Sequence, residues 1–427
     1  MKYNNTRIIV SMSYLLAMPV MANQESVETR ILELESKLSK LEEQSSKSLR
    51  GYWKNGFHFE QPDKEFRLQI GGRVQMDTAF YDADDSLETV KGEFDDGIKF
   101  RRARIFLRGA MYDNLEFFVE HDFAGGHQFR TIYMGVKNVP VLGNLRIGHL
   151  LEPYGLEKFS SNNHITFMER GGPTIFSPVR NSGIMAFDTA LDQRMTWAAG
   201  VFKDTGNFGD SVSNEEFAVT ARITGLPYYS EDGRTYLHLG GNISHRNLNE
   251  EGFRARGRPD SFIAPYVVDT KSIPADSVNI MAYEMLLNLG SFSLQGEWSM
   301  ASVDRLDNAD GSKPGDADFH AYYIYASYIL TGEHRPYVKS NGTFTRITPK
   351  ENATGKKWGK GAWEIAARYN VFDMNDGGIE GGKMSSTTLG LNWHLNPHSR
   401  IMWNYVMADV KDVGDVDVFQ MRFQFDF

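Results

Sequence analysis

Three arginines set two residues apart are the side chains of this chain best suited to chemistry. The motif F-R-A-R-G-R-P-D places Arg254, Arg256 and Arg258 within the long segment 248–277. Residues two apart in an extended segment point the same way, so the three guanidinium groups would form a row with a spacing of about 7 Å. A guanidinium is always charged, and its planar fork binds phosphate oxygens two at a time. The motif therefore indicates a binding row for phosphate-like anions.

Two further groups of cations stand out in a chain that is acidic overall. One group is four arginines of a strand-like segment, Arg101, Arg102, Arg104 and Arg108. The other is five lysines within the segment 331–361, namely Lys339, Lys350, Lys356, Lys357 and Lys360. For all three groups the alternative is a solvated run of charge or, in an outer loop, a contact to lipopolysaccharide phosphates.

No catalytic or metal-binding constellation accompanies these cations. The 11 histidines are scattered without an H-E-x-x-H motif, and Ser244-His245 is only a pair of sequence neighbours. The absence of cysteine excludes thiol nucleophiles and Cys-liganded metals. The segment G-K-K-W-G-K-G at 355–361 lacks the spacing and the hydroxyl residue of a phosphate loop. We therefore expect neither an enzyme nor a bound metal or cofactor, with a barrel esterase as the alternative.

Composition indicates which kind of fold positions these cations. The 427 residues include 40 Gly, only 14 Pro and 13% aromatic residues, and nowhere do 18 apolar residues run together. Such a chain offers no transmembrane helix, but it suits a transmembrane β-barrel, in which only alternate residues face lipid. A formal net charge of -9 argues against a nucleic-acid binder, which normally carries a basic excess.

From Phe66 onward the hydrophobic pattern has a period of two, which predicts strands. In the segment 98–112, one face carries the apolar residues Ala103, Ile105 and Leu107, and the other carries Arg102, Arg104, Phe106 and Arg108. We expect these arginines to lie opposite the acids of the next strand, Glu116, Glu120 and Asp122. A soluble sandwich could not bury so many charges, so the charged face predicts a water-filled lumen.

Sixteen strand-like segments follow one another between residues 66 and 427, an even number. Their connections alternate between tight turns and longer loops, which is typical of an outer-membrane barrel. The connection 331–361 breaks this rule, because it is long yet falls on the short-turn side. A connection of that length in a compact protein is usually functional. We therefore predict an all-β, sixteen-stranded antiparallel barrel over residues 51–427.

The N-terminal region precedes this barrel and has a different character. Residues 1–22 combine a positive start, an apolar stretch and V-M-A, which predicts a cleaved signal peptide; a membrane anchor is the alternative. Removing them leaves the mature chain near a charge of -11, because they carry two positive charges. Apolar residues spaced 4, 3, 4 and 3 from Val27 to Leu41 form a short heptad seam. We interpret 23–50 as a periplasmic coiled-coil helix and linker, with an amphipathic helix lying on its own barrel as the alternative.

Several motifs of the chain resemble the phosphate-selective porin family, porins O and P. They are R-R-A-R (101–104), G-H-L-L-E-P-Y-G-L-E (148–157), M-E-R-G (168–171), G-A-W-E-I-A-A-R-Y (361–369) and G-L-N-W-H-L-N-P (390–397). The resemblance covers most of residues 51–427. It implies a homotrimer of sixteen-stranded barrels, each narrowed by two inward-folded outer loops and one periplasmic connection. It also implies an arginine ladder leading to the constriction and lysines on the periplasmic side.

Carried over by position, the resemblance assigns roles to the cations already named. The ladder falls on Arg101, Arg102, Arg254, Arg256 and Arg258, with Arg104 and Arg108 as further lumen residues. The constriction falls on the loop 151–181, where Lys158 and Arg170 are the candidates. The lysine sink falls on the five lysines of 331–361.

The chain departs from the family pattern at some of these positions. Phe262 stands where a further ladder arginine is expected, and Glu250, Glu251 and Asp260 flank the row. Arg101 and Arg102 are adjacent in a strand, so strict alternation lets only one of them, Arg102, face the lumen squarely.

These features predict an outer-membrane porin that passes small inorganic anions, phosphate or polyphosphate first, by passive diffusion. We expect a homotrimer in contact with outer-membrane lipid and lipopolysaccharide, and no nucleic-acid partner. The alternatives are a porin of the same fold with general or different solute preference, and an adhesin or structural barrel of the outer membrane.

Overall fold

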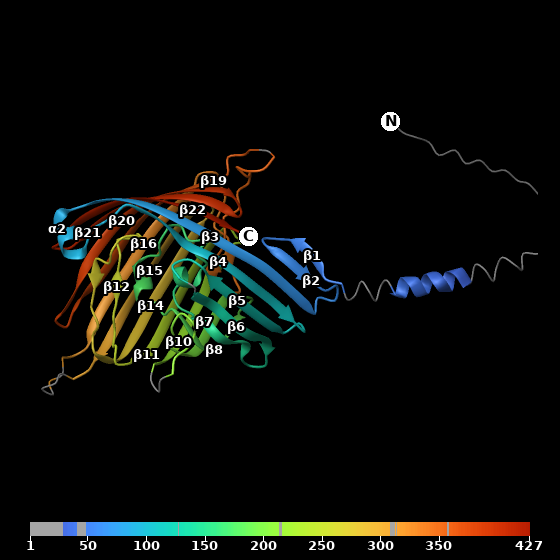
Figure 1. Cartoon of the computed structure of the whole chain (residues 1–427), viewed down its shortest axis with the longest axis horizontal. Coiled ribbons are helices and arrows are strands. Elements are labelled where there is room, and N and C mark those ends of the chain that lie inside the picture. Colours follow the sequence, from blue (N-terminus) through green and yellow to red (C-terminus); the bar gives the residue numbers. More distant parts are fainter. Residues whose placement is uncertain are drawn as a thin grey trace, which may run out of the picture.

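The computed structural model describes residues 29–40, 48–126, 128–212, 216–307, 312, 314–356 and 358–427. The predicted signal peptide, 1–22, lies outside the described residues. Sixteen antiparallel strands close into a barrel (Figure 1), and all sixteen predicted strands are confirmed with ends shifted by a few residues. In chain order they are β3 (Phe66–Ala83), β4 (Gly97–Met111), β5 (Leu115–Asp122), β6 (Gln128–Val139), β7 (Gly143–Leu151), β8 (Arg180–Ala190), β9 (Met195–Lys203), β10 (Phe217–Tyr229), β11 (Thr235–Asn247), β14 (Ala275–Leu289), β15 (Phe292–Arg305), β16 (Ala317–Ile329), β19 (Ala362–Asp376), β20 (Ile379–Asn396), β21 (Ser399–Val410) and β22 (Gly414–Asp426). Pairing of β22 with β3 closes the ring.

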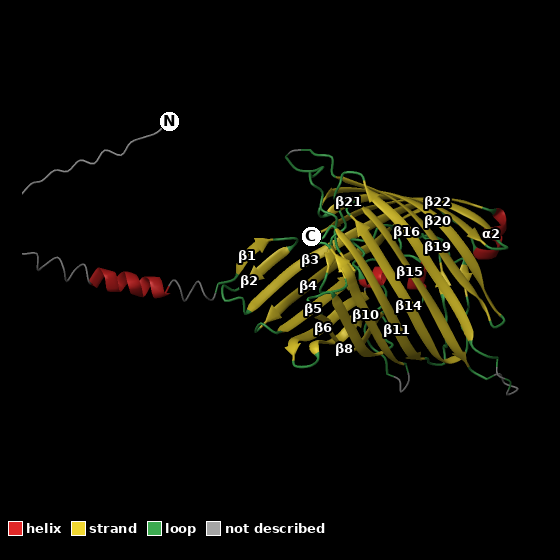
Figure 2. Cartoon of the chain, turned by 180° about the vertical axis from the view of Figure 1, so that it is seen from behind, coloured by secondary structure: helices red, strands yellow, loops and turns green. Residues whose placement is uncertain are grey.

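The two ends of the barrel differ in their connections. Tight turns such as 112–114 and 397–398 lie at the end that carries the C-terminus and the hairpin of β1 (Arg50–Trp53) and β2 (Phe57–Glu60). The opposite end carries α2 (Asp85–Lys91) and most of the long loops (Figures 1 and 2). We call these the short-turn end and the long-loop end.

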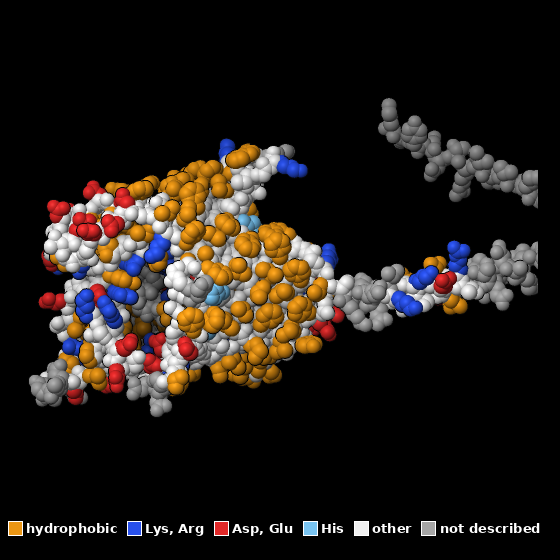
Figure 3. All heavy atoms as spheres, viewed as in Figure 1, with side chains coloured by type: hydrophobic (Ala, Val, Ile, Leu, Met, Phe, Trp, Pro, Cys, Tyr) orange, Lys and Arg blue, Asp and Glu red, His pale blue; other side chains and the backbone are white. Residues whose placement is uncertain are grey.

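The barrel wall separates apolar from polar side chains by strand alternation. In β22, Phe419, Phe423 and Phe425 point outward and are nearly half exposed, whereas Arg422 points inward and is fully buried. Figure 3 shows hydrophobic side chains spread over the outer wall. An apolar outer face with a polar interior is what a barrel immersed in lipid requires.

The N-terminal segment joins the barrel through an extra hairpin. Strand β2 pairs with the start of β3, from Phe57 opposite Ile70 to Glu60 opposite Arg67. It thereby continues the edge of β3 beyond Phe427, whose backbone pairs with Gly72. Before the hairpin, residues 29–40 form a helix with exposed side chains, which covers most of the predicted heptad seam. Among the described residues no helix is long and apolar enough to cross a membrane.

Three insertions from the connections enter the barrel interior. They are the loop 152–179 with α3 (Leu156–Phe159) and η1 (Gly172–Ile175), the loop 248–274 with β12 (Arg256–Gly257) and β13 (Val268–Asp269), and the connection 330–361 with β17 (Tyr337–Val338) and β18 (Thr343–Phe344). Short helical turns are visible inside the wall in Figure 2.

Buried polar contacts hold each insertion against the wall. Tyr154 of the first loop shares a 2.8 Å hydrogen bond with Ser299 of β15. Asp260 of the second loop accepts hydrogen bonds from wall residues of β19 and β20, and Arg335 of the connection forms a buried ion pair with Glu364 of β19. Two inward-folded loops and one short-turn connection narrow the lumen, as the family resemblance implies.

Candidate functional site: a basic lumen

A cavity of about 990 Å³ occupies the lumen between the wall and the insertions. In the described part of the chain its lining contains four side-chain carboxylates, those of Glu120, Asp122, Asp188 and Asp426. The same lining contains thirteen cations: Arg73, Lys99, Arg101, Arg102, Arg104, Arg108, Arg130, Arg146, Lys158, Arg170, Arg180, Arg222 and Arg346. A protein with a net charge of -9 therefore encloses a strongly basic passage.

Both Arg101 and Arg102 line this cavity, so the prediction that alternation admits only one of them is wrong. In the pairing of β3 with β4, Gln75 lies opposite Arg102 and the next pair is Met76 with Phe100. Arg101 is thus the extra residue of a β-bulge, which breaks the alternation locally. Arg102 donates to the side chain of Gln75 at 2.7 Å. Arg101 makes a two-pronged contact to Glu169 of the loop 152–179 at 2.7 and 2.9 Å.

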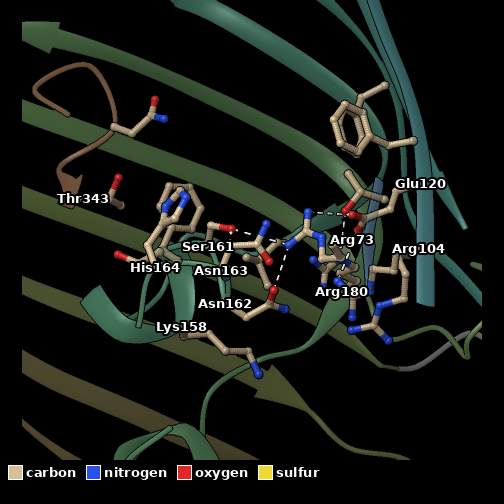
Figure 4. Close-up of a pocket in the computed structure, with 18 of the residues that line it drawn as sticks. Arg73, Arg104, Glu120, Lys158, Ser161, Asn162, Asn163, His164, Arg180 and Thr343 are labelled. Atoms are coloured by element: carbon tan, nitrogen blue, oxygen red, sulfur yellow. Dashed lines mark hydrogen bonds and ion pairs between the residues drawn. The ribbon is translucent and has the colours of Figure 1, made fainter. Parts of the chain in front are cut away.

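The predicted pairing of β4 arginines with acids of β5 is confirmed for Arg104 but not for Arg108. Arg104 contacts Asp122 at 2.6 Å and Glu120 at 3.4 Å. Glu120 also accepts a 3.0 Å ion pair from Arg73 of β3 (Figure 4).

For Arg108, which lies closer to the short-turn end, the predicted pairing with an acid of β5 is wrong. Arg108 donates to Gln69 at 2.6 Å instead of meeting an acid. Glu116 is taken by Arg146 and Lys137, at 2.7 and 3.2 Å. Lys137 lies on the flanking strand β6, whereas Glu116 reaches Arg146 on β7 across Gly135 of β6, which pairs with both residues and has no side chain in the way.

Seven of the thirteen cations have no carboxylate within ion-pair distance in the described part of the chain: Lys99, Arg102, Arg108, Arg130, Lys158, Arg170 and Arg180. Among these seven, Arg130 and Arg180 act electrostatically on Lys158. Arg180 donates to the hydroxyl of Thr131 at 2.8 Å, and Arg130 donates to Gln128 at 3.3 Å. Figure 4 shows Lys158 on α3 with its amine reaching toward the space beside Arg180 and Arg104. We call Arg130, Arg180 and Lys158 the free cation cluster.

The environment of Lys158 weakens its hold on a proton. Burial, together with the positive charges of Arg170 and Arg180, lowers the pKa of Lys158 from 10.5 to about 7. An anion beside the ammonium group would reverse this effect, because an opposite charge favours the charged form. The cluster is therefore suited to receive an anion.

Arg170, the other constriction candidate, also lines the cavity but is committed to the loop itself. It donates to the backbone carbonyls of Glu157 and Ser160 at 2.8 and 2.9 Å. These bonds tie the two halves of the loop 152–179 together near α3. The loop therefore presents Lys158 to the lumen on a scaffold that Arg170 helps to hold.

The arginine row in the loop 248–274 has the predicted common face, since Ala255 and Gly257 between the arginines are buried. The guanidinium groups of the row already contact other side chains of the same loop. Arg254 binds Asp269 through two bonds of 2.6 and 2.9 Å. Arg256 and Arg258 lie over the ring of Tyr266 at 4.2 and 4.3 Å from its centroid.

The row lies outside the main cavity lining and toward the long-loop end. Figure 3 shows lysine and arginine side chains gathered around a hollow near β12. Phe262 connects the row to the cavity, because its ring lies 3.9 Å from the guanidinium of Arg101, 5.2 Å from the ammonium of Lys99 and 5.3 Å from the guanidinium of Arg258. The aromatic residue at this position therefore contacts cations from both groups.

None of the predicted sink lysines that the structure describes lines the main cavity. Lys339 lies 4.0 Å from the ring centroid of Tyr229, and Lys350 donates to the carbonyl of Thr331. Lys356 and Lys360 are exposed, and Lys357 lies outside the described residues. The cation that this connection places in the lumen is Arg346, which also binds Asp426 at 2.6 Å.

Sequence reasoning missed several lining cations, above all Arg73, Arg130, Arg180, Arg222 and Arg346. Each stands alone in its own segment, so no local cluster marks it. A full assignment of inward positions along every strand would have found Arg222, which alternation places on the buried face of β10. Arg130 lies next to a register irregularity between β5 and β6, where alternation gives no answer.

A closed barrel with an apolar outer wall, inward-folded loops and a charged lumen defines the class: this is an outer-membrane porin. The model of the family "Phosphate-selective porin O and P" matches residues 68–427, and the chain belongs to that family. The chain is similar to Porin O of Pseudomonas aeruginosa, with 27% identity over 419 residues, covering 88% of this chain and 91% of the relative.

Solved structures show the same fold at lower identity. An anion-selective porin from Comamonas acidovorans matches with a TM-score of 0.54 and 15% identity, covering 85% of this chain and all of that one. OmpT of Vibrio cholerae, in a trimer form, matches with a TM-score of 0.54 and 12% identity, covering 85% of this chain and 99% of that one.

Proposed function

We propose that this porin passes small anions, with phosphate or polyphosphate foremost, by passive diffusion down a gradient. The observation that carries the proposal is the free cation cluster, three cations without carboxylate partners at the level where the loop 152–179 narrows the lumen. A channel must bind its ion strongly enough to admit it and weakly enough to release it. At about 4 Å a unit pair is worth roughly 1 kcal/mol in bulk water and roughly 4 at an effective dielectric of 20, a range that meets both demands.

The proposed route passes three sets of cations in turn, which are the outer arginine row, Arg101 and the free cation cluster. An anion would meet Arg254, Arg256 and Arg258 at the outer mouth, pass Arg101 beside Phe262, and reach the free cation cluster. Arg346 lines the cavity on the connection side and would mark the way out. The remote acidic surface does not prevent entry, because a Debye length of about 8 Å at physiological salt screens distant charges more than a guanidinium in contact.

The proposal includes a homotrimer, export by the signal peptide 1–22, and a periplasmic position for the helix 29–40. The apolar seam from Val27 to Leu41 spans little more than two heptads, which supports a tethering role, since isolated helices shorter than about 12–15 residues are marginal in water. The outer wall would contact membrane lipid and lipopolysaccharide. The trimer form of the similar barrel from Vibrio cholerae supports the oligomeric state.

A less selective porin is the second candidate, and one observation favours it. Arg254 is neutralised by Asp269, which reduces the charge that the outer row offers to an approaching anion. A row weakened in this way would attract anions in general without a strong preference for phosphate.

The decisive experiment is conductance in planar bilayers with purified wild-type protein and the variant Arg180→Gln. Under a salt gradient the wild type should show the reversal potential of an anion channel, and phosphate should block its chloride current. Arg180→Gln should weaken that block about tenfold, which corresponds to roughly 1.4 kcal/mol. Lys411→Gln, which removes an equal charge from an exposed turn, should behave as the wild type. A cation-type reversal potential would refute the proposal, and chloride passage without phosphate block would favour the general porin.

A further inference from the structure

We propose that the lumen contains a second subsite, a row of aromatic rings that binds the organic body of phosphorylated solutes such as sugar phosphates. This inference rests on the proposed anion passage and specifies its solute class. It concerns the wall formed by β4 to β8, on the short-turn side of the free cation cluster.

Three of the rings lie on consecutive strands and stack on one another. Phe106 of β4 and Phe118 of β5 have ring centroids 5.6 Å apart and an interplanar angle of 18°. Phe118 and Tyr133 of β6 have centroids 5.8 Å apart and an angle of 14°. All three rings are half-buried and line the main cavity.

A guanidinium extends this stack across the next two strands. Arg146 of β7 lies 4.6 Å from the ring centroid of Tyr133 and 4.4 Å from that of Phe187 on β8. Glu116 fixes Arg146 in this position through the 2.7 Å ion pair. The five side chains form one continuous band, which we call the aromatic row: Phe106, Phe118, Tyr133, Arg146 and Phe187.

The wall is shaped to receive at least one of these rings. A Cβ atom at Gly71 would lie 2.3 Å from the ring of Phe106, so only glycine leaves room for the ring against β3. Lumen-facing positions of a membrane barrel are ordinarily polar. Apolar rings left in contact with lumen water therefore indicate a surface that binds something other than a bare ion.

The spacing between the row and the cations matches a small organic phosphate. Phe106 follows Arg104 by two residues on the same face of β4, and Phe118 precedes Glu120 in the same way on β5. Two residues of a strand span about 6.6 to 6.8 Å. A phosphate held at the level of Arg104 and Arg180 would leave its attached sugar ring beside the aromatic row.

The chemistry of the row discriminates between solutes. Aromatic rings stack on the apolar C–H face of a sugar or on a base, and stacking on protein rings is worth about 1–3 kcal/mol for a nucleobase. Inorganic phosphate has no apolar face, so the row gives it no comparable gain. A neutral sugar would lack the attraction of the cations. The combined site therefore prefers solutes that carry both a phosphate and an organic body.

The test is half-block of chloride current by three probes: inorganic phosphate, glucose 6-phosphate and glucose. With the wild type, glucose 6-phosphate should block at the lowest concentration and glucose should not block. Phe118→Leu keeps an apolar side chain but removes the ring, and should raise the half-block concentration of glucose 6-phosphate about fivefold, the ratio that roughly 1 kcal/mol represents. Inorganic phosphate should stay within twofold of its wild-type value.

Two further variants make the test interpretable. Phe419→Leu makes the same change on the outer wall and should alter no block. Tyr133→Leu removes a second ring of the row and serves if Phe118→Leu fails to assemble. Equal loss of both phosphate probes in the row variants would overturn the inference, since the row would then only shape the pore.

The outcomes for the two proposals are separable. Wild-type block by inorganic phosphate without a preference for glucose 6-phosphate would leave the anion porin standing and refute the aromatic subsite. Block by glucose 6-phosphate that depends on Phe118, without block by inorganic phosphate, would refute phosphate passage and retain the subsite. Absence of block by either probe would refute both.

Discussion

The arginine row of the outer loop and the free cation cluster of the barrel interior differ in what their charges already contact. In the row, Arg254 is paired with Asp269, and the other two arginines lie over Tyr266. In the cluster, Arg130 and Arg180 touch only neutral side chains among the described residues. The row is visible in the sequence as one motif, whereas the cluster is assembled from two strands, β6 and β8, and the inserted loop that carries α3. The availability of a cation to a solute thus depends on its partners across the fold and not on its spacing along the chain.

Removing each group of cations as a whole should give the largest difference between the two regions. The double variant Arg130→Gln/Arg180→Gln should weaken phosphate block more than tenfold. A tenfold change corresponds to about 1.4 kcal/mol, and the loss of two close ion contacts can exceed that free energy. The triple variant Arg254→Ala/Arg256→Ala/Arg258→Ala should lower chloride conductance and phosphate block about threefold, since a single partly screened contact is worth roughly 1 kcal/mol or less.

Both variants would be compared at 0.1 M and 1 M chloride, where screening differs strongly. The loss caused by the triple variant should fade at 1 M, because the row acts at the open mouth. Wild-type conductance and block in the triple variant at low salt would remove the row from the pathway. A larger loss in the triple than in the double variant would reverse the ranking of the two regions.

The contribution of Lys158 alone to the free cation cluster can be tested by pH, since its charge varies in the accessible pH range. With a pKa of about 7, Lys158 is positive at pH 6 and largely neutral at pH 8, so chloride conductance should fall as pH rises across this window. The expected decrease is about twofold at low salt, as one charge of the cluster is lost. Chloride is the suitable ion because its own charge does not change.

The matched variant for this prediction is Lys158→Arg, which stays charged throughout the range. Its conductance should not respond to pH between 6 and 8. An unchanged pH response in Lys158→Arg would assign the titration to a different group.

The smallest effect is expected from removing the charge of Asp269, which pairs with Arg254 and so reduces the positive charge of the outer row. Asp269→Asn should free Arg254 and raise anion conductance at low salt by less than twofold, because the exposed pair is worth at most about 1 kcal/mol. The control is Asp373→Asn, which breaks the pair of Asp373 and Lys383, with 33% and 42% of those side chains exposed. Reduced conductance in Asp269→Asn alone would mean that Asp269 positions the row and does not limit it.

The strands of this protein were predictable because lipid and water act on every residue of a barrel wall. In β4, the apolar residues Ile105 and Leu107 and the charged residue Arg104 had to fall on opposite faces, whatever the rest of the chain does. The pairing of Arg104 with Asp122 followed from the order of two consecutive antiparallel strands. These are local consequences of a period of two, and they hold along the strands except at irregularities such as the bulge at Arg101.

The details of the site were not predictable in the same way, because they depend on contacts between distant segments. The bulge that turns Arg101 inward is a property of the pairing of β3 with β4, and its partner Glu169 lies in a loop 68 residues away. The lysines of 331–361 suggested a cationic lining, yet the fold of that connection leaves Lys350 outside and brings Arg346 in.

A barrel with a charged interior follows from alternation and turn spacing alone, since no other arrangement of this chain satisfies both lipid and water. The common face of the Arg254 row follows from the sequence as well, because residues two apart in an extended chain point the same way. Which cations remain without a carboxylate depends on the folded barrel. Closure of the ring and insertion of the loops place Arg130, Arg180 and Lys158 beside one cavity while Asp269 pairs with Arg254. Charge pairing acts through space over a few ångströms, and a linear pattern does not contain those distances.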